Sequence, residues 1–343
     1  MQPIPETDLV IAGGGPAGAA AAIAACSYGL SVVLFERNAA ATLRPGEAAH
    51  PGIEPLLVQL GVMDAVQKAG FLRYEGHWVQ WGREPLCFMP FGQDSQGAWK
   101  GFQLWRPDFD EILLDGAMRA GATVVRPCGA LHPVVEDGRV AGIETPAGVW
   151  RSSFVIDATG RQRFLARVLG LTTRRHGPRR IAWYNYAQGA CACLDQKSPM
   201  IASDADGWTW TARVRPNTYQ WVRVLNDGAR LPGGWQPAEF AGLLVLGERR
   251  GIDATSTIAN PAAGPGYFLA GDAASVVDPL SSHGMLKALM SGIKAAHHAA
   301  AVLRHGAAPR SAASAYNFWL KEWFRYDNDH LAGFYREARA PMM

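Results

Sequence analysis

The N-terminal part of the chain alternates strand and helix patterns. Residues 8–12 (DLVIA) form a short apolar run followed by three glycines, which is typical of a buried parallel strand and its turn. An alanine-rich stretch then predicts a helix, and residues 31–35 predict a second buried strand. Strand, glycine turn, helix and strand in this order form a βαβ unit, so the pattern predicts the parallel sheet of an α/β fold.

Later segments show two contrasting patterns. Residues 153–160 (SFVIDATG) and 266–274 (GYFLAGDAA) are apolar runs that end in aspartate and glycine, and they predict two more buried strands. A long helix opened by a glycine follows the second run. Residues 74–91 and 181–225 instead alternate apolar and polar positions, which predicts antiparallel strands with one buried face.

The turn after the first strand carries the pattern GxGxxG, in Gly13, Gly15 and Gly18 of GGGPAG. Gly13 permits a tight turn, Gly15 lets the backbone approach a pyrophosphate, and Gly18 lets the helix pack closely on the strand. The N-terminus of the helix then faces the anion. Glycine turns are common, but this one lies between a strand and a helix, which is the context that indicates a dinucleotide site.

Two carboxylates narrow the choice of dinucleotide. Glu36 ends the second strand, where its carboxylate can accept hydrogen bonds from ribose hydroxyls and disfavours a 2′-phosphate. The site therefore suits FAD or NAD better than NADP. The second half of FAD requires a carboxylate for its ribityl hydroxyls and a helix N-terminus for its electron-rich pyrimidine end. Asp272 and the helix that begins near Gly284 supply both, so the sequence predicts non-covalently bound FAD.

These patterns predict an α/β fold, α+β overall, in which a Rossmann-type FAD-binding domain is interrupted by a mainly antiparallel β-sheet. We expect the FAD-binding domain to comprise residues 1–73, 101–172 and 253–305, and the substrate domain residues 74–100 and 173–252. Residues 306–343 are expected to form a C-terminal helical segment, with helix over residues 308–340. Four of its residues, at helical spacing, predict a stripe that packs in the core: Trp319, Trp323, Tyr326 and His330.

Composition excludes several partners. The formal net charge is +3, from 33 basic and 30 acidic residues, and no basic run follows a phosphate backbone, so we expect no nucleic acid partner. No apolar stretch is long enough to span a bilayer, and the first one reads as strand, turn and helix, so we expect a cytoplasmic protein without membrane contact. Five cysteines fit neither a disulfide framework nor a metal site, and Cys191 and Cys193 would share one strand face.

Three separated motifs carry a family resemblance. GGGPAG with Glu36, DATG at residues 157–160, and GDAASVVDPLSSHG at residues 271–284 resemble the FAD motifs of the para-hydroxybenzoate-hydroxylase-like flavoproteins. That group includes single-component aromatic monooxygenases, flavin-dependent halogenases and geranylgeranyl reductases. The resemblance extends from residue 8 to about residue 305. It implies that Arg44 and Glu47 of RPGEAAHPG and Arg106 of WRPDFDEILLDGA lie near the isoalloxazine and pyrophosphate.

The same resemblance implies that the chain passes the flavin ring at Asp278, Pro279 and Gly284. Combined with the glycine turn and the acidic strand ends, it gives the following expected FAD contacts: Gly13, Gly15, Ala17, Gly18, Glu36, Arg37, Arg44, Arg106, Asp157, Gly160, Gly271, Asp272, Pro279, Gly284 and Met285.

Two elements are similar to those of flavin-dependent halogenases. GWTWTA at residues 207–212 resembles their GWxWxIP element, and GEAAHP at residues 46–51 resembles their GExxxP element. Ala212 and Arg213, however, replace the isoleucine and proline. Those halogenases also need a lysine that guides hypohalous acid, in the strand that here reads RYEGHWVQWG, where His77 is the nearest match. These departures count against halogenation.

DPLSSHG, WTWTA and the short chain are more similar to the flavoproteins that mature quinone-cofactor amine and amino-acid oxidases, which act on a tryptophan within a partner polypeptide. This resemblance implies hydroxylation of an indole after reduction by NADH or NADPH. No second GxGxxG is visible, so the nicotinamide cofactor is expected to bind only transiently.

The predicted second sheet is rich in tryptophan. Trp208 and Trp210 alternate in WTW and would point to one face, where such side chains suit a flat aromatic ligand. The alternation fits equally well a sheet that packs against helices. On the first interpretation, the expected substrate contacts are Trp78, Trp208, Trp210 and His77.

Candidate catalytic residues are His283, in the loop against the flavin, followed by His50 and Glu47. An imidazole titrates near neutrality and is suited to take a proton from an indole or a flavin adduct. The alternative for His283 is a structural hydrogen bond at the start of the helix. The alternative for Glu47 is a place in the flavin shell or at a helix start.

Three functions follow from these features. The first is an FAD-dependent monooxygenase that hydroxylates an aromatic, indole-like substrate, either a small molecule or a tryptophan side chain in a partner peptide during quinone-cofactor maturation. The second is a flavin-dependent halogenase. The third is a flavin-binding maturation chaperone without turnover, which would show no substrate-stimulated oxidation of NADH or NADPH.

Overall fold

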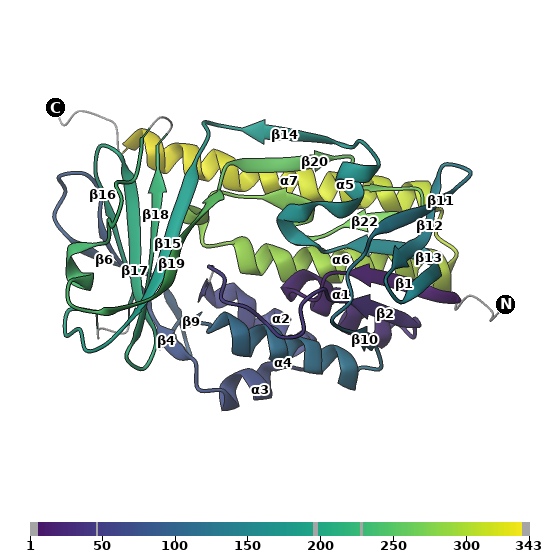
Figure 1. The fold of residues 1–343 in the computed structure, drawn as a ribbon, viewed down its shortest axis with the longest axis horizontal. Coiled ribbons are helices and arrows are strands. Elements are labelled where there is room, and N and C mark those ends of the chain that lie inside the picture. Colours follow the sequence, from purple (N-terminus) through teal and green to yellow (C-terminus); the bar gives the residue numbers. More distant parts are fainter. Residues whose placement is uncertain (1–5, 46, 195–197, 227–228, 338–343) are drawn as a thin grey trace.

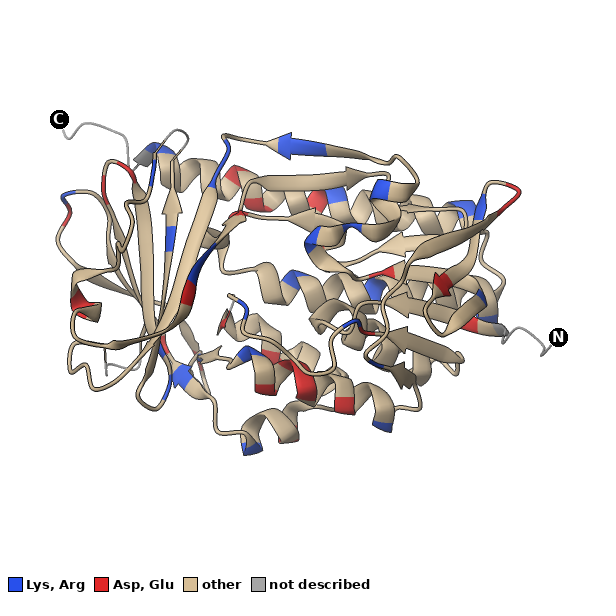
Figure 2. Ribbon diagram, viewed as in Figure 1, with Lys and Arg blue, Asp and Glu red and all other residues tan. Residues whose placement is uncertain are grey.

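The computed structural model describes residues 6–45, 47–194, 198–226 and 229–337. Figure 1 shows an α/β part and an antiparallel sheet side by side, with a long C-terminal helix running along both. This is the predicted fold class, which is confirmed. Among the described residues, no helix combines the length and apolar character needed to cross a bilayer. Figure 2 shows basic and acidic residues interspersed over both parts, with basic residues on β14 (Thr172–His176).

The larger sheet of the α/β part has the strand order β10-β2-β1-β13-β12-β11, with β22 beside β13. β10, β2, β1, β13 and β22 pair in parallel, whereas β12 and β11 continue the sheet as antiparallel strands. The strands are β1 (Glu6–Ala12), β2 (Val32–Phe35), β10 (Thr123–Val125), β11 (His132–Glu136), β12 (Arg139–Thr145), β13 (Gly148–Asp157), β21 (Ala263–Gly264) and β22 (Tyr267–Leu269).

The register of the parallel strands brings distant segments to one edge. Ala12 at the end of β1 lies opposite Phe35 of β2 and Asp157 of β13, and Asp157 lies opposite Leu269 of β22. The segments that follow these strands therefore leave the sheet at the same level. In open α/β sheets this carboxyl edge is where ligands bind.

The helices cover the sheet and extend beyond it. They are α1 (Pro16–Ser27), α2 (Glu54–Gln59), α3 (Met63–Lys68), α4 (Arg106–Arg119), α5 (Phe164–Val168), α6 (Gly284–His305) and α7 (Pro309–Glu337). Residues 16–25 of α1 are all buried, as expected of a helix that is apolar on every side. α1 packs tightly on α6 because the residues at their contact are small. A Cβ on Gly292 would lie 2.1 Å from the carbonyl oxygen of Ala17.

The second part is a seven-stranded sheet of order β19-β15-β18-β17-β16-β5-β6, antiparallel except for the β16–β5 pair. Its strands are β5 (Gly76–Gln80), β6 (Cys87–Pro90), β15 (Ile181–Gln188), β16 (Met200–Ser203), β17 (Gly207–Arg215), β18 (Thr218–Leu225) and β19 (Leu244–Asp253). Small sheets complete the fold: β14 with β20 (Ser256–Asn260) and β23 (Ser275–Val276), β9 (Gly101–Gln103) with β3 (Ala48–Ala49) and β4 (Leu72–Tyr74), and β7 (Gln93–Asp94) with β8 (Gly97–Ala98).

The terminal helix is present, but its predicted core stripe is wrong. Tyr326 is 52% exposed, and His330 is exposed as well. The buried stripe runs one position away and consists of Tyr316, Leu320, Phe324, Asp327 and Leu331. The prediction followed the aromatic residues of the helix. The buried stripe instead includes an acid, Asp327, which a pattern of aromatic side chains does not select. Residues 338–340 of the predicted helix lie outside the described residues.

The strand predicted around Cys191 and Cys193 is also wrong, because β15 ends at Gln188 and both cysteines lie in the turn that follows. Their Sγ atoms are 3.1 Å apart, so the two side chains meet across the turn. Both are free thiols, Cys191 buried and Cys193 exposed.

Candidate active site

A cavity of about 1020 Å³ lies at the carboxyl edge of the parallel strands. Its walls come from both parts of the molecule: the N-terminal ends of α1 and α6, the ends of β2 and β13, and one face of the seven-stranded sheet. The parallel-strand edge predicted to bind a dinucleotide therefore opens directly onto the sheet predicted to bind a substrate.

The glycine turn forms the first wall. Gly13 has a φ of +105°, and a Cβ there would lie 2.4 Å from the carbonyl oxygen of Ala158. A Cβ on Gly18 would lie 1.9 Å from the carbonyl oxygen of Gly13, so the helix approaches the turn as closely as glycine allows. Gly18 itself is buried and does not line the cavity. A Cβ on Gly15 would meet nothing within 4 Å, because Gly15 borders the open cavity with Ala17.

The acidic strand ends have different roles. Glu36 lines the cavity, and its carboxylate accepts hydrogen bonds from the amide of Gly14 at 2.7 Å and from Asn38. Asp157 is fully buried and does not line the cavity. Its carboxylate accepts from Thr159 and from the amide of Leu165, so it holds the turn after β13 rather than facing a ligand. Arg37 and Gly160 line the cavity beside these groups.

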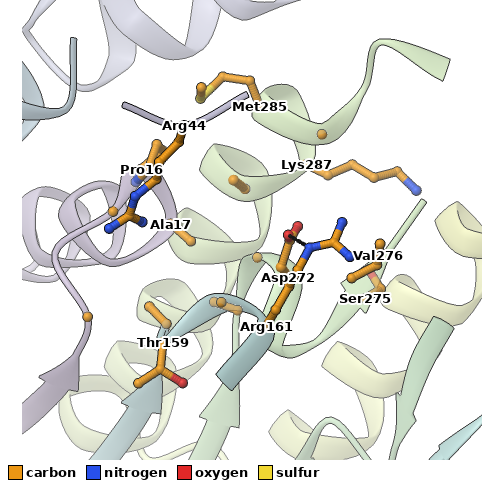
Figure 3. A pocket seen from close by; sticks show the side chains of 18 of the residues that line it. Pro16, Ala17, Arg44, Thr159, Arg161, Asp272, Ser275, Val276, Met285 and Lys287 are labelled. Carbon is orange, nitrogen blue, oxygen red and sulfur yellow. Dashed lines mark hydrogen bonds and ion pairs between the residues drawn. The ribbon is translucent and has the colours of Figure 1, made fainter. Parts of the chain in front are cut away.

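The far end of the cavity carries Asp272, which forms an ion pair with Arg161 at 3.2 Å. Figure 3 shows Asp272 and Arg161 pointing toward one another, with Lys287 extending away from Arg44. Asp272 follows Gly271 in the turn after β22. A carboxylate thus lies at each end of the cavity, Glu36 near α1 and Asp272 near α6, at the separate positions that the two halves of FAD require.

Glu47 is a buried carboxyl group that lines the cavity between Arg44 and Arg106. Burial raises its pKa to about 8, although the Tyr186 hydroxyl and Arg106 favour the charged form. Its Oε2 has no hydrogen-bond partner among the described residues. Arg106 is held by a bidentate pair with Asp110, at 2.9 Å for each bond. The neutral Glu47 carboxyl therefore has a donor free for a ligand. Gly46 of the same motif lies outside the described residues.

The N-terminus of α6 closes the cavity, where Pro279, Gly284 and Met285 all line it. A Cβ on Gly284 would meet nothing within 4 Å, so the backbone there borders open space, as at Gly15. Among the described residues, the cavity therefore offers two helix N-termini, two carboxylates and one buried oxygen without a hydrogen-bond partner. These groups fit FAD, which has an anionic centre, ribose and ribityl hydroxyls and an electron-rich pyrimidine.

The second sheet presents an aromatic and aliphatic wall to the cavity. Trp208 and Trp210 point into it from β17, so the face that sequence alternation left open is the one toward the cavity. Trp221, on β18, packs on the opposite side against Trp235. Trp78 does not line the cavity and instead packs against Phe88. The remaining side chains of this wall are Ala182, Tyr184, Ile201, Val222 and Ile252.

A hydrogen-bonded chain ties this wall to the loop before α6. The indole nitrogen of Trp208 donates to the Tyr335 hydroxyl at 2.8 Å, and that hydroxyl donates to Asp278 at 2.9 Å. Arg180 pairs with the same carboxylate oxygen of Asp278 at 2.8 Å, and its guanidinium lies 3.9 Å from the centre of the Tyr335 ring. The end of α7 therefore positions both the substrate wall and the chain next to the cofactor site.

Three histidines predicted as site residues come together, but none of them lines the cavity. The rings of His50 and His283 are 5.7 Å apart, edge to face. His77 lies behind them, with its ring 5.3 Å from both Tyr74 and Phe91. His77 Nε2 is buried without a hydrogen-bond partner among the described residues. Burial and then the charge of His50 lower the pKa of His77 to about 4, so the ring is neutral at physiological pH.

The depressed pKa of His77 predicts acid sensitivity. His77 takes up a proton near pH 6.5 in the unfolded chain but only near pH 4 in the folded protein. The histidine therefore costs the fold no stability above pH 6.5, and the fold loses stability as the pH falls from 6.5 toward 4. Between these two values the wild type should lose about 2–3 kcal/mol of unfolding free energy relative to His77→Phe. Denaturant unfolding across this pH range measures the difference, and parallel curves for the two proteins would contradict the assignment.

Sequence reasoning missed three polar residues that shape the site. Asp327 and Tyr335 lie on α7, far in sequence from every predicted motif, and Lys287 lines the cavity from α6. Asp327 could have been found, because it is an acid at a helical spacing otherwise occupied by buried apolar residues. Tyr335 and Lys287 carry no comparable signal, since their partners are set by tertiary packing.

Known proteins share this architecture. Residues 8–105 match the family model described as tryptophan halogenase. The chain is 27% identical over 336 residues to a tryptophan 2-halogenase of Chondromyces crocatus, covering 86% of this chain and 61% of that protein, so it spans less than two thirds of that halogenase. It is 28% identical to a digeranylgeranylglycerophospholipid reductase of Methanoculleus marisnigri, covering 92% of this chain and 81% of that protein.

Two solved structures extend the comparison. The flavin-dependent brominase Bmp2 superposes with a TM-score of 0.82 at 23% identity, covering 92% of this chain and 84% of that one, which shows the fold. The peptidyl tryptophan dihydroxylase QhpG superposes with a TM-score of 0.75 at 25% identity, covering 98% of this chain and 76% of that one. Fold, cavity and relatives together define an FAD-dependent oxidoreductase. The chain is similar to the FAD-dependent halogenases and monooxygenases and to geranylgeranyl-reductase-like enzymes.

Proposed function

We propose that this protein is an FAD-dependent monooxygenase that hydroxylates an indole, in the form of a tryptophan side chain within a partner peptide. The observation that carries the proposal is the wall of Trp208, Trp210 and Tyr184 facing the cavity next to the expected flavin position. Flat aromatic side chains with one polar edge suit an indole. The similarity to a peptidyl tryptophan dihydroxylase over nearly the whole chain supports the same substrate class.

The proposed reaction balances with two co-substrates. One aromatic C–H, O₂, NADH or NADPH and one proton give the hydroxylated ring, the oxidised nicotinamide and water. Bound FAD would accept the hydride and activate the oxygen. The protein would hold the cofactor with the glycine turn, Glu36 and Asp272, and would orient the ring against the tryptophan wall.

Halogenation is the second candidate, and most of the comparisons favour it: the family model, the Chondromyces crocatus relative and the brominase are all halogenases. One lysine, Lys287, lines the cavity among the described residues, and its ammonium is held by Asp327 and the carbonyl oxygen of Trp323. His77, at the position where the resemblance implies a lysine, is neutral and off the cavity, so it does not provide the cation. This placement is why we rank hydroxylation first.

One experiment separates these functions. The FAD-loaded protein is incubated with a tryptophan-containing peptide or free tryptophan, with NADH or NADPH and isotopically labelled O₂, and with or without bromide. Hydroxylation predicts one or more labelled oxygens in the peptide regardless of bromide. Brominated product that appears only with bromide would replace the proposal with halogenation. Absence of any substrate-stimulated nicotinamide oxidation would instead favour a flavin-binding chaperone.

A further inference from the structure

Five arginines form one basic surface beside the cavity. This arginine surface consists of Arg161, Arg163, Arg167, Arg175 and Arg179. Arg163 is half-buried and the others are exposed. Among the described residues, Asp272 and Asp253 are the acids that interact with the arginine surface. Five arginines against two aspartates leave an excess of three positive charges, as large as the formal net charge of the whole chain.

The register of a small sheet connects the arginine surface to the cavity. In the sheet of β14, β20 and β23, Arg175 lies opposite Thr257, and Thr257 lies opposite Val276. Directly opposite residues of antiparallel strands project to the same face. Val276 lines the cavity, and Arg163 donates a hydrogen bond to the Thr257 hydroxyl. The arginine surface therefore continues from the cavity to the edge strand β14, across two strand spacings or about 10 Å.

The arginine surface has hydrogen-bonding capacity left for a ligand. Arg167 has no ion-pair partner among the described residues. Arg161 contacts Asp272 through Nε alone, at 3.2 Å, which leaves its two terminal nitrogens for a ligand (Figure 3). The side chain of Arg179 is 61% exposed and lies 4.0 Å from Asp253, a long distance for an ion pair. Further carboxylates can therefore bind without displacing a tightly held partner.

The shape of the arginine surface favours a polypeptide as its ligand. Arg161 and Arg167 line the cavity, whereas the other three arginines lie outside its wall. A ligand that contacts all of them must extend out of the cavity, as a polypeptide does when one of its side chains is bound inside. The planar guanidinium group matches a carboxylate with two parallel hydrogen bonds. Aspartate and glutamate side chains of such a polypeptide are therefore the groups that this surface fits.

We propose that the arginine surface binds an acidic segment of the partner polypeptide, next to the tryptophan that enters the cavity. The inference rests on the proposed function, because it takes that tryptophan to be part of a polypeptide. Carboxylates of the segment pair with Arg167, Arg175 and Arg179 while the tryptophan ring lies against the aromatic wall. Charge thus selects the partner, and the aromatic wall selects the residue that reacts.

Two labelled peptides of equal length test the proposal. Each has one tryptophan, flanked on both sides by glutamates in the first peptide and by glutamines in the second. Binding to the FAD-loaded protein is followed by fluorescence anisotropy without NADH or NADPH, so the measurement does not depend on turnover. We expect the glutamate peptide to bind at least about tenfold more tightly at low salt, because several exposed ion pairs add to its affinity. Added sodium chloride should remove this preference.

Arg175→Glu and Arg174→Glu form a matched pair of variants. Both residues are exposed on β14, but successive residues of a strand point to opposite faces. His176 lies on the same face as Arg174, and its ring centre is 6.0 Å from that of Phe324, so this face is turned toward α7. We expect Arg175→Glu to weaken binding of the glutamate peptide about tenfold, and Arg174→Glu to weaken it less than about twofold.

A neutral variant guards against a change of fold. Arg175→Gln/Arg179→Gln places no new negative charge beside Asp253, and it should still reduce the preference for the glutamate peptide to about twofold. All variants should retain equal amounts of FAD, because none of the substituted residues lines the cavity. NADPH and a single-stranded oligonucleotide are tested as competitors, since phosphates also pair with arginine.

The outcomes separate the arginine surface from the proposed function. Equal affinities for the two peptides, or equal losses in Arg175→Glu and Arg174→Glu, overturn the proposal. Binding of NADPH or the oligonucleotide that depends on Arg175, without a preference for glutamates, assigns the surface to a phosphate ligand and overturns it as well. A wild type that prefers the glutamate peptide but does not hydroxylate its tryptophan overturns the function and leaves the acidic docking surface standing. One that binds and hydroxylates both peptides equally well overturns the docking surface alone.

Discussion

Replacing Gly15 with leucine is expected to yield a folded protein that no longer binds FAD. The φ of Gly15 is −71°, which any residue adopts, and a Cβ there meets no protein atom within 4 Å. The leucine side chain would therefore extend into the cavity at the N-terminus of α1, where the cofactor pyrophosphate must approach the backbone. We expect FAD affinity to fall by at least about a hundredfold, equivalent to about 3 kcal/mol.

Gly233→Leu is the matched control for this variant. Gly233 also has open space around its Cβ position, but it does not line the cavity. Both variants should unfold, in the absence of FAD, within about 0.5 kcal/mol of the wild type, because each adds a side chain to open space. Titration with FAD, followed by flavin fluorescence, separates them. If Gly15→Leu bound FAD as tightly as the wild type, the glycine turn would not be part of the cofactor site.

The second large effect is expected from Arg180→Met, which should lower the free energy of unfolding. The side chains of Arg180 and Asp278 are 8% and 4% exposed, and they form a buried ion pair at 2.8 Å. Methionine leaves the Asp278 carboxylate buried with only Tyr335 and the local backbone as partners. Removing one partner of a buried pair lowers the free energy of unfolding by about 3–5 kcal/mol. Denaturant unfolding with matched FAD saturation measures this loss.

The neighbouring Arg179 provides the control. Its side chain is 61% exposed and lies 4.0 Å from Asp253, so Arg179→Met should change stability by less than about 0.5 kcal/mol. The deficit of Arg180→Met should also shrink as the pH is lowered, because burial raises the pKa of Asp278 and a protonated carboxyl no longer requires a cation. Equal losses in the two variants, or a deficit independent of pH, would contradict a buried pair at this position.

The local parts of the cofactor site could be predicted from the sequence. Gly13, Gly15 and Glu36 lie on consecutive elements of one βαβ unit, so their spacing alone brings them to the same sheet edge. Asp272 could be placed because it lies in the turn that follows a strand of the same parallel sheet. Asp157 shows the limit of this reasoning: it ends a neighbouring strand, but its carboxylate turns inward to hold the following turn.

The substrate side could be predicted only in part. Alternation correctly gave Trp208 and Trp210 a common face, since side chains two apart along a strand point the same way. It could not decide which face meets the cavity, because that depends on how the sheet is placed over the α/β part. For the same reason, the roles of Asp327 and Tyr335 could not be predicted. The packing of α7 brings them near their partners at the start of α6 and on the preceding loop.

The central claim is that these separated segments bind one FAD without a covalent bond. The most direct measurement is the absorption spectrum of the purified protein after incubation with FAD and gel filtration, repeated after denaturation. We predict flavin bands that coelute with the protein at one FAD per chain, and flavin that separates from the denatured chain. A protein fraction without flavin absorption would contradict the cofactor site, and flavin that stays with the denatured chain would contradict non-covalent binding.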